Sequence, residues 1–195
     1  MPARRPVLTD PEVLEALAHP VRLDLLSYLM SNGPASASEC ARAVGDTPSN
    51  SSYHLRTLAR HGLVERVESV DRRRRPWRAT ITGFDMNLDA APASREGRGA
   101  AAVLAASLAL EQRLLRDYLS RRDAVPARWR DADVASTYTL RMTPGELKAL
   151  GNQLDALIRP LIAAVRTSAP EDAALVNLDL FAFPRLEEPW SPAER

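Results

Sequence analysis

Apolar side chains in the first sixty residues recur at helical spacing and predict four short helices. The first begins either at Asp10 or at a capping box that starts at Thr9, and the break at His19-Pro20 separates it from the second. The third opens with a capping box at Ser36, and the fourth covers residues 48–60. Only a tight turn separates the third and fourth helices, an arrangement typical of a helix-turn-helix.

A change to period-two alternation follows the fourth helix. Residues 63–70 and 76–82 are predicted to be the two strands of a hairpin. Four consecutive arginines stand at its tip, namely Arg72, Arg73, Arg74 and Arg75. Charge runs are usually solvated turns, but a guanidinium can also bridge phosphate oxygens or enter a narrow minor groove. The position directly after a helix-turn-helix favours a DNA-contacting wing.

The second half of the chain has a different pattern. Residues 83–99 have the composition of a linker. Residues 100–121 are an alanine-rich helix former, interpreted as a dimerisation helix or, alternatively, as a helix that packs on its own wing domain. Residues 134–142 and 175–183 are expected to be strands, and a capped helix is expected from residue 144 to about 166, bent at Pro160. Five aromatic side chains are expected to form a small core there or, alternatively, to line an apolar ligand pocket: Trp129, Tyr138, Phe181, Phe183 and Trp190.

The predicted fold class is therefore α+β, mainly α. A winged helix-turn-helix domain is expected in residues 1–82, a linker in 83–99, and a dimerisation region with a helical segment and a small α/β part in 100–195.

The net charge of +1 hides an uneven distribution. Residues 1–80 carry 12 arginines and 9 acidic residues, so positive charge collects where the predicted wing lies. The single cysteine, Cys40, excludes an intramolecular disulfide and is expected to be a small buried hydrophobe, with a redox-sensing thiol as the alternative. Without a nucleophile–base set, a glycine-rich phosphate loop or metal-ligand spacing, we expect no enzyme, cofactor or metal site. Without a spanning or signal segment, we expect no membrane contact and a cytoplasmic location.

Several motifs stand in an order that resembles the ArsR-type winged-helix repressors. They lie within residues 10–82 and are His19-Pro20-Val21-Arg22, Glu39-Cys40-Ala41, Ser52-Tyr53-His54-Leu55-Arg56 and Gly62-Leu63-Val64. The resemblance implies a homodimer with each recognition helix in a major groove and each wing on the flanking backbone. Metal sensors of that family use paired cysteines or sets of histidine and carboxylate. Because this chain has only Cys40 and no histidine after residue 61, it resembles a branch that does not sense metals.

The outer side of the fourth helix is predicted to read DNA. An asparagine side chain can hydrogen-bond to the edge of adenine, an arginine to the edge of guanine, and a serine to either a base or a phosphate. Ser52 and His54 are instead expected to contact phosphate or to be structural. The predicted DNA-binding residues are Ser49, Asn50, Ser52, Tyr53, His54, Arg56, Arg60, Arg72, Arg73, Arg74 and Arg75.

These observations predict a sequence-specific transcription regulator, a homodimeric repressor that binds double-stranded DNA at an inverted repeat. The alternative is a sensor whose second half binds an apolar small-molecule effector and so controls DNA binding.

Overall fold

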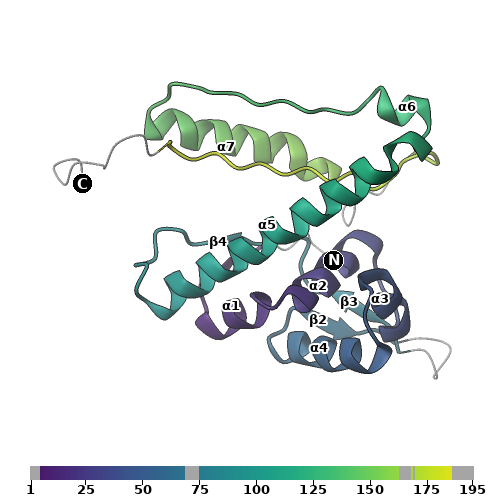
Figure 1. Cartoon of the computed structure of the whole chain (residues 1–195). Coiled ribbons are helices and arrows are strands. Elements are labelled where there is room, and N and C mark those ends of the chain that lie inside the picture. The colour runs from purple at the N-terminus through teal and green to yellow at the C-terminus, as the bar shows by residue number, and fades with distance from the viewer. Residues whose placement is uncertain (1–4, 69–74, 163–167, 169, 186–195) are drawn as a thin grey trace.

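The computed structural model describes residues 5–68, 75–162, 168 and 170–185. A domain of four short helices and two small sheets forms one end, and the long helix α5 leads away from it toward α7 (Figure 1). The elements, in chain order, are β1 (Val7–Leu8), α1 (Pro11–Leu17), α2 (Pro20–Asn32), α3 (Ala37–Val44), α4 (Pro48–Arg60), β2 (Val64–Arg66), β3 (Trp77–Ala79), β4 (Asp85–Met86), α5 (Arg95–Arg121), η1 (Arg122–Ala124), α6 (Ala127–Arg130), α7 (Pro144–Ile158) and η2 (Arg159–Leu161). Among these described helices, none has the length and apolar character needed to cross a membrane.

The short helices begin where side chains can satisfy their first backbone N–H groups. The Asp10 carboxylate accepts a 2.9 Å hydrogen bond from the backbone N–H of Glu12, which decides between the two predicted starts of α1. Ser36 and Glu39 form the predicted capping box of α3, and the Thr47 hydroxyl caps α4. The four predicted helices are confirmed.

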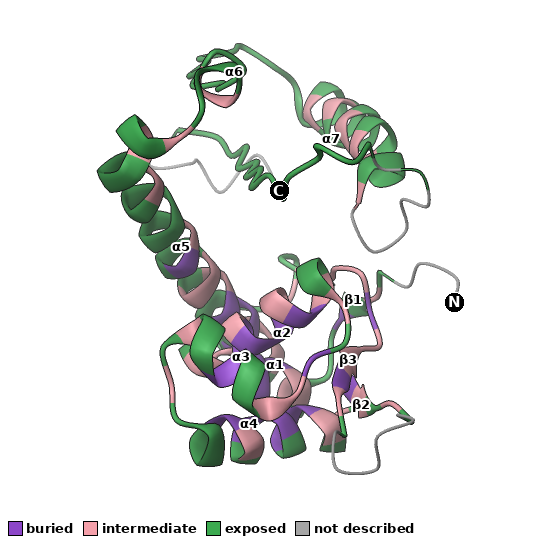
Figure 2. Ribbon diagram, turned by 90° about the vertical axis from the view of Figure 1, so that its right-hand side faces the viewer, coloured by how far each residue is buried: buried purple, intermediate pink, exposed green. Residues whose placement is uncertain are grey.

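One core joins α1, α2, α3, α4 and the first half of α5, and the buried residues concentrate there (Figure 2). Each fully buried leucine stabilises such a core by roughly 1.5–3 kcal/mol relative to an exposed one. The largest fully buried side chains among the described residues are Leu14, Leu17, Leu25, Leu26, Leu29, Cys40, Ser51, Leu55, Leu58, Val64 and Val103. Burial raises the pKa of Cys40 to about 11, so the thiol packs as a small hydrophobe and stays protonated.

The predicted hairpin is present as the antiparallel pair β2–β3. Glu65 lies opposite Arg78, and their side chains form a 2.6 Å ion pair. The strand β3 also bridges to Ala35, and the Arg66 guanidinium lies 3.8 Å from the centre of the buried Trp77 ring. The hairpin is thus fastened to the helical core at its base.

The helix α5 begins at Arg95, so the prediction of a linker throughout residues 83–99 is wrong; β4 lies in this range too and pairs with β1. Gly99 packs so closely on α1 that a Cβ atom there would lie 2.8 Å from the Cβ of Leu14. An ion pair of 2.9 Å between Arg95 and Glu15 supports the same contact. Small residues that resemble a linker in composition therefore permit close helix packing here.

The two strands expected in the second half are not formed. Residues 134–142 and 175–183 run extended (Figure 1), but the described part of the chain gives them no strand partner. Tyr138 is 78% exposed and Phe183 is 74% exposed, so the expected aromatic core is absent from the described residues. Trp190 lies outside the described residues.

The helix α7 has the predicted start but a different end. It stops at Ile158 and a short η2 turn follows, rather than continuing to residue 166 with a bend at Pro160. A proline removes a backbone donor and disfavours helical geometry in the residue before it, which accounts for the earlier end.

Candidate nucleic-acid interface

The turn between α3 and α4 sets the direction of the candidate recognition helix. Gly45 takes a left-handed conformation with φ of 69° and ends α3, and Thr47 caps α4 only two residues later. Leu55 and Leu58 are fully buried against the core, so α4 is fixed along its inner side. Its outer side remains accessible to a partner.

Asp46, in that turn, organises the start of α4, a role that was not predicted from the sequence. Its carboxylate accepts a 3.0 Å hydrogen bond from the buried Ser51 hydroxyl and bonds of 3.0 and 3.1 Å from the Asn50 amide. Desolvation raises the pKa of Asp46, but hydrogen bonds from Asn50, the Thr47 backbone and Ser51 outweigh it and lower the pKa overall. The carboxylate is therefore charged at neutral pH and holds the Asn50 side chain in place.

The outer side of α4 presents most of the predicted reading residues. Tyr53 is 55% exposed, and the Arg60 guanidinium is positioned by a 3.1 Å hydrogen bond to the Thr57 hydroxyl. Because the Asn50 amide donates to Asp46, its side-chain oxygen is the group left to accept from a base. The exposed residues are Ser49, Asn50, Tyr53, Arg56 and Arg60, and Ser52 is half-buried.

His54 departs from this pattern: of the two roles predicted for it, phosphate contact or a structural role, its burial supports the structural one and corrects its place among the DNA-binding residues. Only 5% of the residue is exposed, and its ring lies 4.5 Å from the ring of His19, between α4 and the α1–α2 junction. The Nδ1 atoms of both rings are buried, and neither has a hydrogen-bond partner among the described residues. Burial, followed by the neighbouring positive charge of Arg22, lowers the pKa of His19. Burial, followed by His19 and Arg22, also lowers the pKa of His54, with Asp46 opposing. His54 is a packing residue.

Three arginines are near enough to one another, where α4 meets the wing, to interact electrostatically. Burial lowers the pKa of Arg66, and the nearby charges of Arg75 and Arg56 lower it further. Arg66 also donates a hydrogen bond to the Arg75 carbonyl oxygen, which holds the two residues together. Arg75 is exposed, whereas Arg72, Arg73 and Arg74 lie outside the described residues. We call Arg56, Arg66 and Arg75 the arginine group.

Arg66 was missed by the sequence reasoning, which gave weight only to the uninterrupted run at the hairpin tip. The available signal was its place in the expected strand 63–70, at the base of that run. Three guanidinium groups that raise one another's positive potential are suited to a polyanion.

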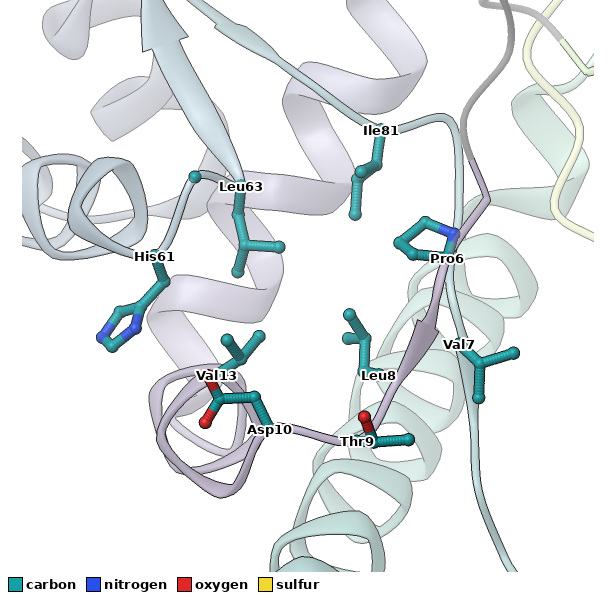
Figure 3. A pocket seen from close by; sticks show the side chains of 10 residues that line it. Pro6, Val7, Leu8, Thr9, Asp10, Val13, His61, Leu63 and Ile81 are labelled. Atoms are coloured by element: carbon teal, nitrogen blue, oxygen red, sulfur yellow. The ribbon is translucent and has the colours of Figure 1, made fainter.

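A cavity of about 190 Å³ lies elsewhere in the same domain, among β1, the start of α1 and the end of α4. Apolar side chains of Pro6, Leu8, Val13, Leu63 and Ile81 surround it (Figure 3). Sites for drug-sized ligands usually enclose roughly 300–1,000 Å³, so this cavity is small for one. The pocket expected in the second half is not supported, because Tyr138, Phe181 and Phe183 are exposed.

The core, the two helices around Gly45 and the hairpin that follows define a winged helix-turn-helix, the domain class of many DNA-binding transcription regulators. A family model described as a helix-turn-helix domain matches residues 17–67, which include α2, α3, α4 and β2. The N-terminal domain is therefore of the helix-turn-helix type.

Two further comparisons add little to this assignment. The X-ray crystal structure of YusO protein from Bacillus subtilis is similar at 20% identity and a TM-score of 0.33, over 76% of this chain and 83% of that chain. No curated protein matches the chain. The ArsR-type branch therefore stays a prediction.

Proposed function

We propose that the protein is a homodimeric transcriptional repressor of the ArsR type, without metal sensing, that reads an inverted-repeat operator. One observation supports it above the others: the exposed side of α4 and the arginine group form a polar, positive surface on a rigid core. Affinity for DNA is dominated by phosphate neutralisation, and sequence is read by side chains at base edges. Both kinds of residue occur together here.

The proposed roles of the individual residues follow from their positions on α4 and on the wing. Ser49, Asn50, Tyr53 and Arg56, on the outer side of α4, enter a major groove and contact base edges. Ser52, Arg60 and the arginines from Arg72 to Arg75 contact the backbone, and Arg66 joins them. Two such surfaces related by a two-fold axis, with recognition helices roughly 34 Å apart, match two half-sites one DNA turn apart.

The deciding experiment is selection of bound sequences from random duplex DNA across a salt series. We expect an inverted repeat to be enriched, and affinity to fall by roughly 10³–10⁵ between 50 and 200 mM salt if six to ten phosphates are contacted. A shallow salt dependence with no enriched sequence contradicts the proposal.

Two arginine variants separate reading from general attraction. We expect Arg56→Ala to lower affinity for the selected operator by about 1–3 kcal/mol while affecting random DNA much less. Arg73→Ala combined with Arg74→Ala weakens binding to both DNAs and lowers the salt slope by about 2. Arg128→Ala, an exposed arginine of α6, is the matched control and leaves both affinities unchanged. Equal loss on both DNAs for Arg56→Ala removes it from the reading set.

A further inference from the structure

The chain leaves an unusual amount of surface uncovered, and many of its exposed large apolar side chains lie in the described residues after 133. The chain exposes 14376 Å² of accessible surface at a mass of 21.4 kDa. A folded monomer of that mass exposes about 9,100 Å², so the excess is about 5,000 Å². Stable obligate dimers bury roughly 1,000–2,500 Å² on each chain. The excess is therefore large enough to supply such an interface.

The helix α5 carries two apolar stripes rather than one. Gly99, Val103 and Leu110 are buried and face the chain's own N-terminal domain. A second stripe lies on the far side of the helix, because residues seven apart return to the same side. We call it the outer stripe: Ala101, Leu104, Leu108, Leu115 and Leu119.

The outer stripe has the character of a helix–helix contact. Leu115 and Leu119 are each 58% exposed, and Ala101 is exposed with them. A helix that covers a single core is polar on its outer side, whereas this one is apolar there too. Heptad spacing with a small residue at one end suits close packing against a second helix.

The two extended segments are the other uncovered part. In residues 134–142 the apolar side chains alternate with polar ones, with Val134, Tyr138 and Leu140 on one side. In residues 175–183 only the stretch from Val176 to Leu180 alternates, the last four residues are all apolar, and Leu178 is 61% exposed. Each segment thus exposes apolar side chains and lacks a partner strand among the described residues.

The placement of the segments favours a partner from another copy. Within one chain, both segments run alongside α7 (Figure 1), and no strand pairing joins them among the described residues. The Asn177 amide donates a 2.6 Å hydrogen bond to Glu111 of α5, which anchors residues 175–183 beside the helix that carries the outer stripe. A second copy packed on the outer stripe would bring its own α5 and its own segment 134–142 to this same place.

We propose that a second copy of the chain covers the outer stripe, and that residues 134–142 of each copy pair as a strand with residues 175–183 of the other. The inference rests on the proposed function, which requires two recognition helices to read two half-sites. It deepens that function by identifying the surface that joins the two chains. The arrangement gives both extended segments hydrogen-bond partners and buries their apolar sides.

The first test is sedimentation of the full-length protein without DNA. We expect a dimer at micromolar concentration, and self-association at least about tenfold weaker in Leu115→Asp, because a carboxylate replaces an apolar contact in a buried interface. Ala109→Asp, an exposed position of α5 away from the stripe, is the matched control and leaves the dimer intact. Unchanged helical content and unfolding of the N-terminal domain show that the variant is folded. A monomeric wild type, or a dimer equally affected by both variants, overturns the proposal.

The second test asks which chains pair. Chains carrying Thr139→Cys are mixed with differently tagged chains carrying Asp179→Cys, and both are oxidised; the native Cys40 is fully buried. We expect a disulfide between the two kinds of chain. If it instead forms only when one chain carries both substitutions, the segments pair within a chain and the proposal is wrong.

Neither test uses DNA, so the two proposals can fail separately. A cross-linked dimer that selects no operator overturns the DNA-reading function and leaves this interface standing. A monomer that binds the operator does the reverse.

Discussion

Asp46→Ala removes the carboxylate that organises the start of α4. The buried Ser51 hydroxyl then loses its 3.0 Å partner, and an unsatisfied buried hydroxyl costs about 1–3 kcal/mol. The bond to exposed Asn50 adds only a few tenths of a kcal/mol, because solvent screens it. We therefore expect the free energy of unfolding to fall by about 1–3 kcal/mol, a large share of the roughly 5–15 kcal/mol typical of a domain.

Urea unfolding followed by far-UV circular dichroism measures this loss. Ser51→Ala removes the hydroxyl itself, so the double variant Asp46→Ala with Ser51→Ala should cost clearly less than the sum of the two single variants. Asp46→Ala should also weaken discrimination among DNA sequences, because the Asn50 amide is no longer held. A loss below about 0.5 kcal/mol with additive single variants refutes the reasoning, since water would then satisfy Ser51 equally well.

Acid provides a second check on the same carboxylate. The pKa of Asp46 is lowered in the folded protein from an ordinary value of 3.8. Its stabilisation is therefore complete above that value and is lost as the pH falls through the lower folded pKa. The loss of stability below pH 4 should be smaller in Asp46→Ala than in the wild type.

Two further predictions concern the core. Gly99→Ala gains about 1 kcal/mol of helix propensity. Its Cβ would lie 2.8 Å from the Cβ of buried Leu14, and such overpacking costs about 1–3 kcal/mol. We therefore expect the free energy of unfolding in urea to fall by up to about 2 kcal/mol. The pKa values of His19 and His54 are lowered in the folded protein, so the stabilisation from keeping both rings neutral is complete above the ordinary pKa of 6.5 and is lost as the pH falls through the folded pKa values. The urea midpoint should therefore decrease when the pH is lowered from 7.5 to 5. The decrease should be smaller in His54→Leu.

Each of these has a control that can contradict it. Gly151→Ala in α7, where a Cβ meets nothing within 4 Å, should increase helical content, which shows the propensity gain without the clash. A net stabilisation by Gly99→Ala would contradict the close contact of α5 with α1. Equal acid sensitivity in the wild type and His54→Leu would assign the pH dependence to other groups.

The N-terminal domain was predictable because its signals are local. Caps such as Ser36 and Thr47, the left-handed Gly45 and the alternation of residues 63–70 each specify their own element. For His54 the sequence left phosphate contact and a structural role open, and only the packing of α4 on the α1–α2 junction reveals its burial. Arg66 depends on a contact across the hairpin, which the spacing of arginines along the chain does not encode.

The second half was less predictable for a different reason. The period-two alternation in residues 134–142 forms a strand only where a second strand can pair with it. The described residues of one chain provide no such partner. The linker composition of residues 83–99 was misleading, because Gly99 serves close packing on Leu14 rather than flexibility. A residue type alone does not distinguish these two uses of glycine.

The continuity of α5 has a consequence for how a dimer of this kind would fit its DNA. The helix is held by the N-terminal domain near Val103 and Leu110, also through a 2.7 Å ion pair between Arg113 and Asp24, and continues without interruption to Arg121. Inserting one residue after Arg113 turns everything beyond it by about 100° and shifts it by about 1.5 Å. In the proposed dimer, the length of α5 thus sets the helical phase between the two recognition helices, and so selects which operator spacings can be bound.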